Sequence, residues 1–345
     1  MNKKLIFSKH HHTTIITIPI ILTFMFCGIF LTDITSIFLL YLKNFIAYHF
    51  GWLYIFAVSI ILIFIIFLAC SKYGKIKLGA QHTTPQFSYL AWIAMLFSAG
   101  LATGLVFWGI GEPITHFASP LELTAYSPAA AQEALDITFF HWGLHMWAVY
   151  AITAMMIAYF SYRYDHPLAF RTVLYPVFGK KVTDGILGNI IDSLAVIATL
   201  FGIATSLSFA AIQINSGLNY VFAIEKNNII LILIIFILTT IATFSAVTGV
   251  KRGIKYLSEI NLWMAITLMI FFIICGSTIF IFNSFIQTLG SYPKTLLAKS
   301  FWIDTKPLPA VAGRFNMLFN VIDNYFVSHI TTGCTEISSC PESLS

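Results

Sequence analysis

Seven apolar stretches, each long enough to cross a lipid bilayer, constrain this 345-residue chain more than any other feature. In an α-helix, about 20 apolar residues span the roughly 30 Å hydrocarbon layer of a membrane. Each stretch must be helical, because an unpaired backbone amide is costly in lipid. The sequence therefore predicts an all-α polytopic membrane protein with seven transmembrane helices. These are expected at residues 13–32, 51–70, 88–110, 138–160, 189–221, 229–248 and 258–282.

Composition agrees with this fold class. The chain is 58% hydrophobic and 10% charged, whereas about 25% of the residues of a soluble domain are charged. Three lysines precede the first apolar stretch, as they would in a signal peptide. That stretch lacks a small-residue cleavage pattern and is followed by six more, so we expect a retained first helix.

The distribution of basic residues predicts the orientation in the membrane. With the N-terminus inside, thirteen of the 19 Lys and Arg residues lie in cytoplasmic segments: Lys3, Lys4, Lys9, Lys72, Lys75, Lys77, Arg163, Arg171, Lys180, Lys181, Lys251, Arg252 and Lys255. The loop 111–137 has no Lys or Arg but has Glu112, Glu122, Glu133 and Asp136. This positive-inside pattern predicts a multi-pass protein of the cell inner (plasma) membrane with a cytoplasmic N-terminus.

Sequence motifs for enzymatic chemistry are missing from the chain. It contains no CxxC or Cys/His metal spacing, no phosphate-binding GxxxxGK[ST] loop and no HExxH. No acid–base or nucleophile cluster stands out either. We therefore expect no enzyme activity, no bound cofactor and no nucleic-acid partner.

Aromatic residues crowd the segment HWGLHMWAVY, residues 141–150. If each residue turns a continuous helix by about 100°, Trp142, Trp147 and Tyr150 frame one sector with Gly143 between them. Aromatic faces around a gap suit a quaternary ammonium group, which cannot donate hydrogen bonds. The alternative is an aromatic belt at the membrane interface. That alternative fits Trp142 better than the two deeper rings.

Two histidines in the same segment, His141 and His145, have the i,i+4 spacing of metal ligands. No third ligand is evident in the sequence. Packing or hydrogen bonding between helices is therefore the favoured interpretation of this pair.

A run of small residues occupies the third apolar stretch, FSAGLATGLVFWGIGEP, residues 97–113. One interpretation is close helix packing through Gly100 and Gly104. The other is a broken helix whose freed carbonyl groups coordinate a cation and whose backbone lines a substrate site. Pro113 is expected to end this helix.

Four segments, in this order, resemble the betaine/carnitine/choline transporter family between residues 87 and 283: SAGLATGLVFWGIGEP, FFHWGLHMWAVYAI, AVIATLFGIATSL and SAVTGVKRGIKYLSEIN. The resemblance implies a fold of twelve helices in which helices three to seven and eight to twelve are inverted repeats. It also implies secondary active transport of glycine betaine, choline or carnitine, by sodium symport with protons as the alternative, and hence osmoprotection. Family members resemble trimers, so a homotrimer in the lipid bilayer is implied.

The resemblance also implies site residues. Trp142, Trp147 and Tyr150 match the aromatic box, and Gly100, Ala102 and Gly104 match the glycine-rich stretch. Ser98 and Leu101 match positions whose carbonyl groups hold sodium, and Thr199 matches a hydroxyl proposed for a second ion. The chain departs from the family at Ala102, where glycine is expected, at Thr103, and at Ile203, which replaces a second threonine.

The C-terminal part departs most. The predicted organisation is two N-terminal helices in 1–86, the first five-helix repeat in 87–285, and a polar periplasmic-side tail in 286–345 that is not native family structure. The family's second repeat, with the other half of the aromatic box, is not recognised. A second hypothesis is therefore a truncated, transport-inactive fragment of such a transporter.

Overall fold

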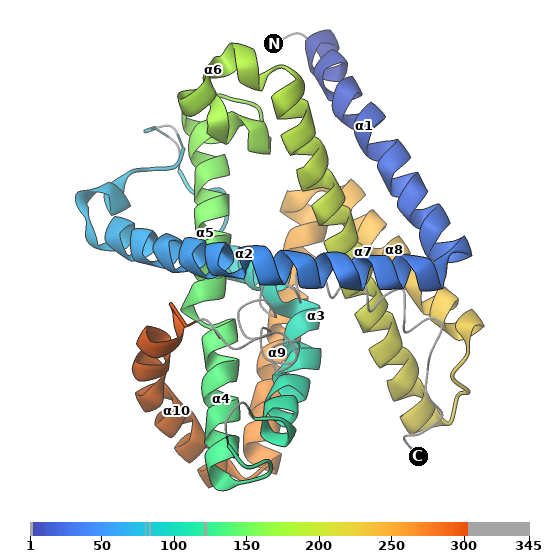
Figure 1. Cartoon of the computed structure of the whole chain (residues 1–345), viewed down its shortest axis with the longest axis vertical. Coiled ribbons are helices and arrows are strands. Elements are labelled where there is room, and N and C mark those ends of the chain that lie inside the picture. Colours follow the sequence, from blue (N-terminus) through green and yellow to red (C-terminus); the bar gives the residue numbers. More distant parts are fainter. Residues whose placement is uncertain (1–2, 80, 83, 121–122, 303–345) are drawn as a thin grey trace. The chain divides into compact units, whose positions relative to one another are not determined.

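The computed structural model describes residues 3–302 except for 80, 83, 121 and 122 (Figure 1). The side chains of residues 3–12, 99–106, 251 and 252 are also outside the description. Within these limits every regular element is helical. Six segments of the described residues are long and apolar enough to cross a membrane: Thr13–Phe30, Thr32–Cys70, Pro128–Arg163, Ile186–Phe222, Asn228–Thr248 and Lys255–Cys275.

The prediction of an all-α polytopic membrane fold is confirmed. The one expected span that is not among these six, the third, 88–110, coincides with helix α3, Tyr89–Ala118. The part of α3 with described side chains contributes a shorter apolar stretch, Tyr89–Ser98.

The chain folds into two compact units that do not follow its linear order. Unit 1 comprises Met1–Thr83, His141–Thr205 and Ser300–Ser345, and unit 2 comprises Thr84–Phe140 and Ser206–Lys299. The division into two N-terminal helices, a five-helix repeat and a tail stays a prediction.

Unit 1 is built around a long helix, α2, Thr32–Cys70, which packs against α5, Leu144–Ala158. Helix α2 has 39 residues, so it extends well beyond the expected span 51–70. Helix α1, Lys3–Phe30, meets α2 at a corner where the Thr35 hydroxyl is 2.8 Å from the Leu31 carbonyl oxygen. Unit 1 also contains three short helical turns: the 3-10 helix η1, Lys72–Lys75, the π-helix η2, Tyr159–Arg163, and the 3-10 helix η3, Phe170–Leu174. It is completed by the short helix α6, Tyr175–Thr183, and the first part of α7, Ile186–Phe222.

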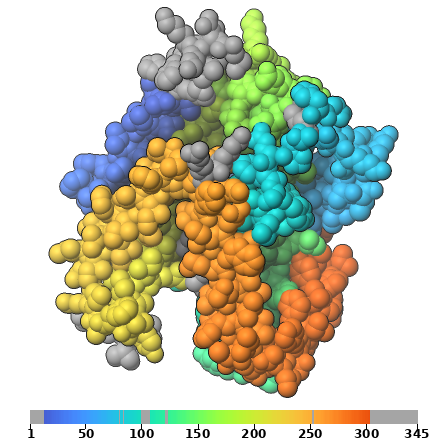
Figure 2. Space-filling view, turned by 180° about the vertical axis from the view of Figure 1, so that it is seen from behind, coloured from blue at the N-terminus to red at the C-terminus, as the bar shows by residue number. Residues whose placement is uncertain are grey.

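Unit 2 pairs α3 with α9, Lys255–Cys275. In Figure 2, α9 is orange and the start of α3 is cyan. The other helices of this unit are α4, Pro128–Trp142, α8, Asn228–Thr248, α10, Thr278–Lys299, and the later part of α7.

Two glycines make the connection from α8 to α9 in unit 2. Gly249 has φ 84°, a left-handed conformation that side chains disfavour. Gly253 lies in the π-helix η4, Val250–Ile254, where an added Cβ would be 2.0 Å from Thr248 Oγ1. The connection between α8 and α9 therefore depends on two residues that have no side chain, Gly249 and Gly253.

The end of α3 differs from the prediction. Pro113 lies inside the helix, which continues to Ala118. Proline removes one backbone donor, the N–H that would bond to the Gly109 carbonyl oxygen, and membrane helices tolerate such a loss. Beyond Pro113 the Thr115 hydroxyl donates to the Gly111 carbonyl oxygen at 2.7 Å, and the Ser119 N–H donates to the Thr115 carbonyl oxygen at 2.9 Å.

Helix α10 continues through Gly290 and Pro293 to Lys299, inside the segment that was expected to be a polar tail. Its polar residues have partners on α4. The Ser291 hydroxyl donates to the Asp136 carboxylate, which also accepts from Gln132 Nε2 at 2.9 Å. Polarity that suggested a tail therefore belongs to one face of an amphipathic helix.

Candidate substrate and cation site

The aromatic segment is interrupted by a helix break at Gly143. Helix α4 ends at Trp142 and α5 begins at Leu144, and Gly143 between them has φ −90° and ψ −143°. The prediction of one continuous helix over 138–160 is therefore wrong. Glycine is among the least favourable residues in a helix interior, so the break falls at the residue that resists it least.

The break separates the three predicted rings of the aromatic box. Trp147 and Tyr150 lie on α5 with ring centroids 6.0 Å apart and an interplanar angle of 67°, an edge-to-face pair. Both side chains are half-buried. Trp142, also half-buried, ends α4 on the other side of Gly143. The structure therefore places two of the rings together, and their role in binding stays a prediction.

The histidines of this segment are buried. His145, 1% exposed, lies with Nε2 3.0 Å from the Ser300 hydroxyl oxygen. The Ser300 carbonyl oxygen in turn accepts a hydrogen bond from the Ser59 hydroxyl on α2. His141 is also buried, but it belongs to α4. The bond of His145 to Ser300 supports the favoured interpretation, hydrogen bonding between segments.

The small-residue stretch of α3 is helical in the structure, because α3 runs as one helix from Tyr89 to Ala118. The helix break that would free carbonyl groups is thus seen in the aromatic segment and not here. The side chains of Leu101, Ala102 and their neighbours are outside the described residues. The proposed roles of Gly100, Leu101, Ala102 and Gly104 stay predictions.

Ser98, predicted to help hold sodium, is joined to α9. Asn261 Nδ2 donates to Ser98 Oγ at 3.0 Å, and Ser98 Oγ lies 3.4 Å from the Ser258 carbonyl oxygen. The sequence analysis did not predict a role for Asn261. The spacing could have indicated one, because Ser258 and Asn261 are polar residues three apart at the start of an apolar span and therefore lie on one face of the helix.

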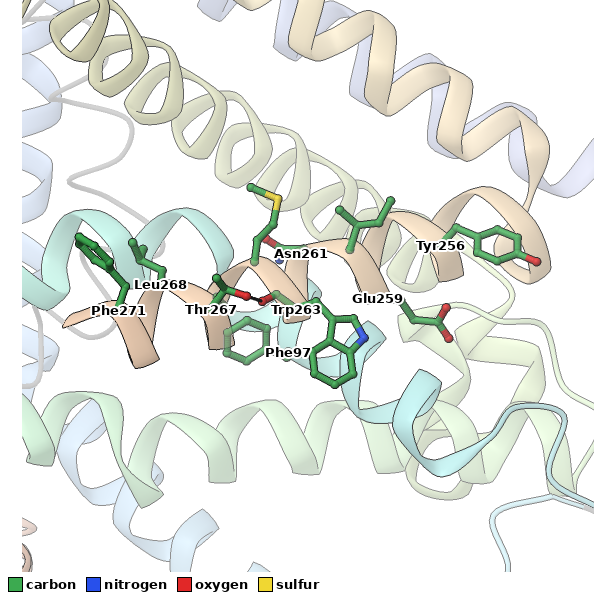
Figure 3. A pocket seen from close by; sticks show the side chains of 11 residues that line it. Phe97, Tyr256, Glu259, Asn261, Trp263, Thr267, Leu268 and Phe271 are labelled. Atoms are coloured by element: carbon green, nitrogen blue, oxygen red, sulfur yellow. Dashed lines mark hydrogen bonds between the residues drawn. The ribbon is translucent and has the colours of Figure 1, made fainter. Parts of the chain in front are cut away.

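A groove of about 880 Å³ runs along α9 next to this contact. Figure 3 shows Phe97 of α3 near Trp263 and Thr267 of α9. The carboxylate of the groove, Glu259, lies 3.8 Å from Lys255 Nζ. The groove therefore presents mainly apolar surface and a carboxylate that already has a basic neighbour.

Thr199, predicted as a ligand of a second ion, lies on an exposed face of α7. Its hydroxyl donates to the Ala195 carbonyl oxygen one turn earlier, at 2.8 Å. Such a hydroxyl keeps oxygen lone pairs for a cation, so the assignment of Thr199 remains a prediction.

A buried ion pair lies in unit 1 near the start of α7. Arg171 and Asp192 are 5% and 8% exposed, and the Arg171 Nε donates to the Asp192 carboxylate. The Arg171 backbone N–H donates to the same carboxylate at 3.0 Å, and its Nη2 donates to Asn189 Oδ1 at 3.0 Å and to Thr13 Oγ1 at 3.2 Å. The pair therefore joins α1, η3 and α7, a role that counting positive charges could not reveal.

These observations define a polytopic α-helical membrane protein with a transmembrane segment interrupted beside paired aromatic rings. Interrupted helices are typical of secondary transporters. The chain belongs to the betaine/carnitine/choline family of transporters (BCCT), whose sequence pattern matches residues 12–316. The match covers α1 from residue 12, all of α2, and residues beyond 286.

Several curated proteins are similar to the chain. A glycine betaine transporter of Acinetobacter baylyi is 42% identical over 285 residues, which are 83% of this chain and 43% of that protein. The glycine betaine transporter OpuD of Bacillus subtilis is 46% identical over 261 residues, 75% of this chain and 51% of that protein. The osmo-dependent choline transporter BetT2 of Acinetobacter baylyi is 39% identical over 273 residues, 79% of this chain and 40% of that protein. The chain thus spans about half the length of these relatives, which are transporters and not enzymes.

Proposed function

We propose that this chain takes part in secondary active transport of a quaternary ammonium solute, glycine betaine, choline or carnitine, coupled to sodium. The observation that carries the proposal is the edge-to-face pair of Trp147 and Tyr150 on α5, directly after the break at Gly143. The similarity to glycine betaine and choline transporters supports the same class of solute.

The chemistry of the solute explains why rings would bind it. A trimethylammonium group carries a positive charge but no N–H, so a hydrogen-bond acceptor gains little from it. The negative faces of Trp and Tyr rings attract such a cation, by about 2 kcal/mol each once water is excluded. Trp147 and Tyr150 would form one wall of the proposed box, and Trp142, at the end of α4, is the proposed third ring.

Sodium is the proposed coupling ion, and protons are the alternative. Sodium is a hard cation that prefers oxygen ligands. The carbonyl groups of Ser98 and Leu101 and the hydroxyl of Thr199 are the proposed ligands. The hydrogen bond from Asn261 to Ser98 is a support for this part of α3. Transport would follow from binding of the ion and the solute to one state of two repeats that rock to switch access.

The alternative function is a membrane-inserted chain that does not transport by itself. This alternative rests on the position of the solute site in such transporters, between two repeats, of which the first is recognised in this sequence. In either case the protein is a multi-pass membrane protein, with the N-terminus proposed on the cytoplasmic side and a homotrimer proposed as the assembly.

Uptake and binding together test the proposal. Cells that lack their own uptake systems would express the chain, and labelled glycine betaine and choline would be followed with and without a sodium gradient. In parallel, the purified chain in lipid nanodiscs would be titrated with both solutes while tryptophan fluorescence is recorded. Sodium-dependent uptake supports transport, and binding without uptake supports the transport-inactive alternative. If neither solute is bound or taken up, the proposal fails.

A further inference from the structure

The connection between α5 and α7 carries a short amphipathic helix, α6. Helix α6 buries Tyr175 and Thr183. The residues between these two are exposed, among them Val177 (73%), Phe178 (51%) and Val182 (52%) and the basic residues Lys180 and Lys181. We call these five residues the α6 surface. It combines apolar side chains with positive charge in nine residues.

The two buried residues of α6, Tyr175 and Thr183, fix the position of the α6 surface. The Tyr175 hydroxyl donates to Asp184 Oδ1 at 2.8 Å, and burial together with this carboxylate raises the pKa of Tyr175 to about 12. A Cβ on Gly188 would be 1.8 Å from the Thr183 carbonyl oxygen, so the end of α6 lies directly on the first turn of α7. The surface is thus part of unit 1 and does not need a ligand to order it.

A conformational break shapes the same surface. Gly179 in the middle of α6 has φ 74° and ψ 154°, a conformation that glycine adopts readily. Phe178 precedes this glycine and Lys180 follows it, each in a short helical turn. Both side chains are exposed.

The structure divides the positive charges of this connection into two kinds. Arg171 is buried, and its guanidinium group is engaged by Asp192, Asn189 and Thr13. Lys180 and Lys181 are exposed. The nearby acidic residue Asp184 is bonded to Tyr175, and Asp165, which is exposed, lies before η3. The α6 surface therefore carries two outward lysines with no acidic residue among its members.

We propose that the α6 surface binds the anionic headgroups of membrane lipids, with Val177, Phe178 and Val182 inserted at the boundary between headgroups and acyl chains. Apolar side chains next to lysines are the pattern of helices that lie in a membrane interface. Lysines near a membrane surface are attracted to anionic lipids. This proposal does not rest on the proposed transport function, because it needs only the inserted chain.

Lipid-specific fluorescence quenching tests the proposal. The five cysteines, Cys27, Cys70, Cys275, Cys334 and Cys340, would be replaced by serine. A bimane fluorophore would then be attached at Val177→Cys, in nanodiscs of mixed phosphatidylglycerol and phosphatidylcholine. One of the two lipids at a time would carry a doxyl quencher near the top of its acyl chain. We expect the labelled phosphatidylglycerol to quench about twofold more strongly than the labelled phosphatidylcholine.

Charge variants then identify the lysines as the cause. K180Q/K181Q should make quenching by the two lipids equal. The matched pair K226Q/K294Q, which removes two exposed lysines elsewhere, should keep the preference. A second label at Val182→Cys should behave like the first, so that a local effect of one substitution is recognised.

Two outcomes would overturn the proposal. Equal quenching by the two lipids before any lysine is replaced would show that headgroup charge is not recognised. Quenching by aqueous iodide and by neither lipid would place the α6 surface in water. Circular dichroism of each variant would establish that the helices are retained.

Discussion

Asn261 of α9 donates a hydrogen bond to the hydroxyl of Ser98 on α3, with 3.0 Å between nitrogen and oxygen. This bond joins the two helices of unit 2 next to the small-residue stretch of α3. The α3–α9 contact can therefore be altered by mutation at Asn261 without any change in the small-residue stretch itself.

Replacing Asn261 by leucine should loosen the α3–α9 contact. Hydrogen bonds between membrane helices contribute about 0.6 kcal/mol on average, so we expect unfolding in detergent to require slightly less denaturant. Thr267→Val on the same helix is the control, because the Thr267 hydroxyl donates within α9, to the Trp263 carbonyl oxygen at 2.8 Å, and to no other helix among the described residues. Equal effects of the two substitutions would contradict the assigned role of the Asn261 bond.

Removing one partner of the Arg171–Asp192 pair should be far more damaging. A buried charge left without its partner costs about 3–5 kcal/mol, so Arg171→Met and Asp192→Asn should each lower stability strongly in denaturant titrations. The double variant Arg171→Met/Asp192→Leu should recover part of the loss, since no unpaired charge remains.

The matched control for that pair is Lys255 with Glu259, which lie 3.8 Å apart with side chains 30% and 27% exposed. Partly exposed pairs contribute about 0–1 kcal/mol. Lys255→Met should therefore have a small effect. A loss as large as that of Arg171→Met would refute the distinction between the two pairs.

Gly253→Ala should destabilise the turn between α8 and α9. The added Cβ would be 2.0 Å from Thr248 Oγ1 and 2.2 Å from the Ser245 carbonyl oxygen, so backbone must move. Gly217→Ala in α7 meets nothing within 4 Å, and alanine is preferred to glycine in a helix by about 0.5–1 kcal/mol. Thermal unfolding should thus move to lower temperature for Gly253→Ala only. The same change in both variants would be evidence against close packing at Gly253.

Trp147→Ala should weaken binding of glycine betaine or choline, if Trp147 is part of the box. Loss of an interaction of about 2 kcal/mol corresponds to an apparent Kd raised about 30-fold. Trp147→Phe should lose less, because an aromatic face remains. Trp263→Ala, which removes a 55% exposed ring from α9, is the control for the fluorescence titration. An unchanged Kd for Trp147→Ala would remove this ring from the site.

Hydropathy predicted the membrane class and the helices well, because the cost of unpaired amides in lipid leaves few alternatives. It failed where a single residue decides local geometry. Pro113 did not end α3, since the helix continues past it to Ala118. Gly143 did interrupt the fourth span, although a uniform turn per residue carried the prediction through it.

Side-chain partners were harder to predict than helices. The sequence shows Arg171 and Asp192 as two charges 21 residues apart, and only the fold places them in contact. Asn261 and Ser98 are separated by 163 residues, and their bond depends on which faces of α3 and α9 meet. The aromatic rings were easier to single out, since Trp and Tyr stand out in an apolar span and their spacing suggested one face.

Because of the interruption at Gly143, Trp142 and Trp147 belong to two separate helices, α4 and α5, although only four residues lie between them. A change in the backbone angles of Gly143 would alter the distance between the rings of Trp142 and Trp147 without unwinding α4 or α5. The width of the proposed aromatic box would therefore depend on the φ and ψ angles of a single residue, Gly143.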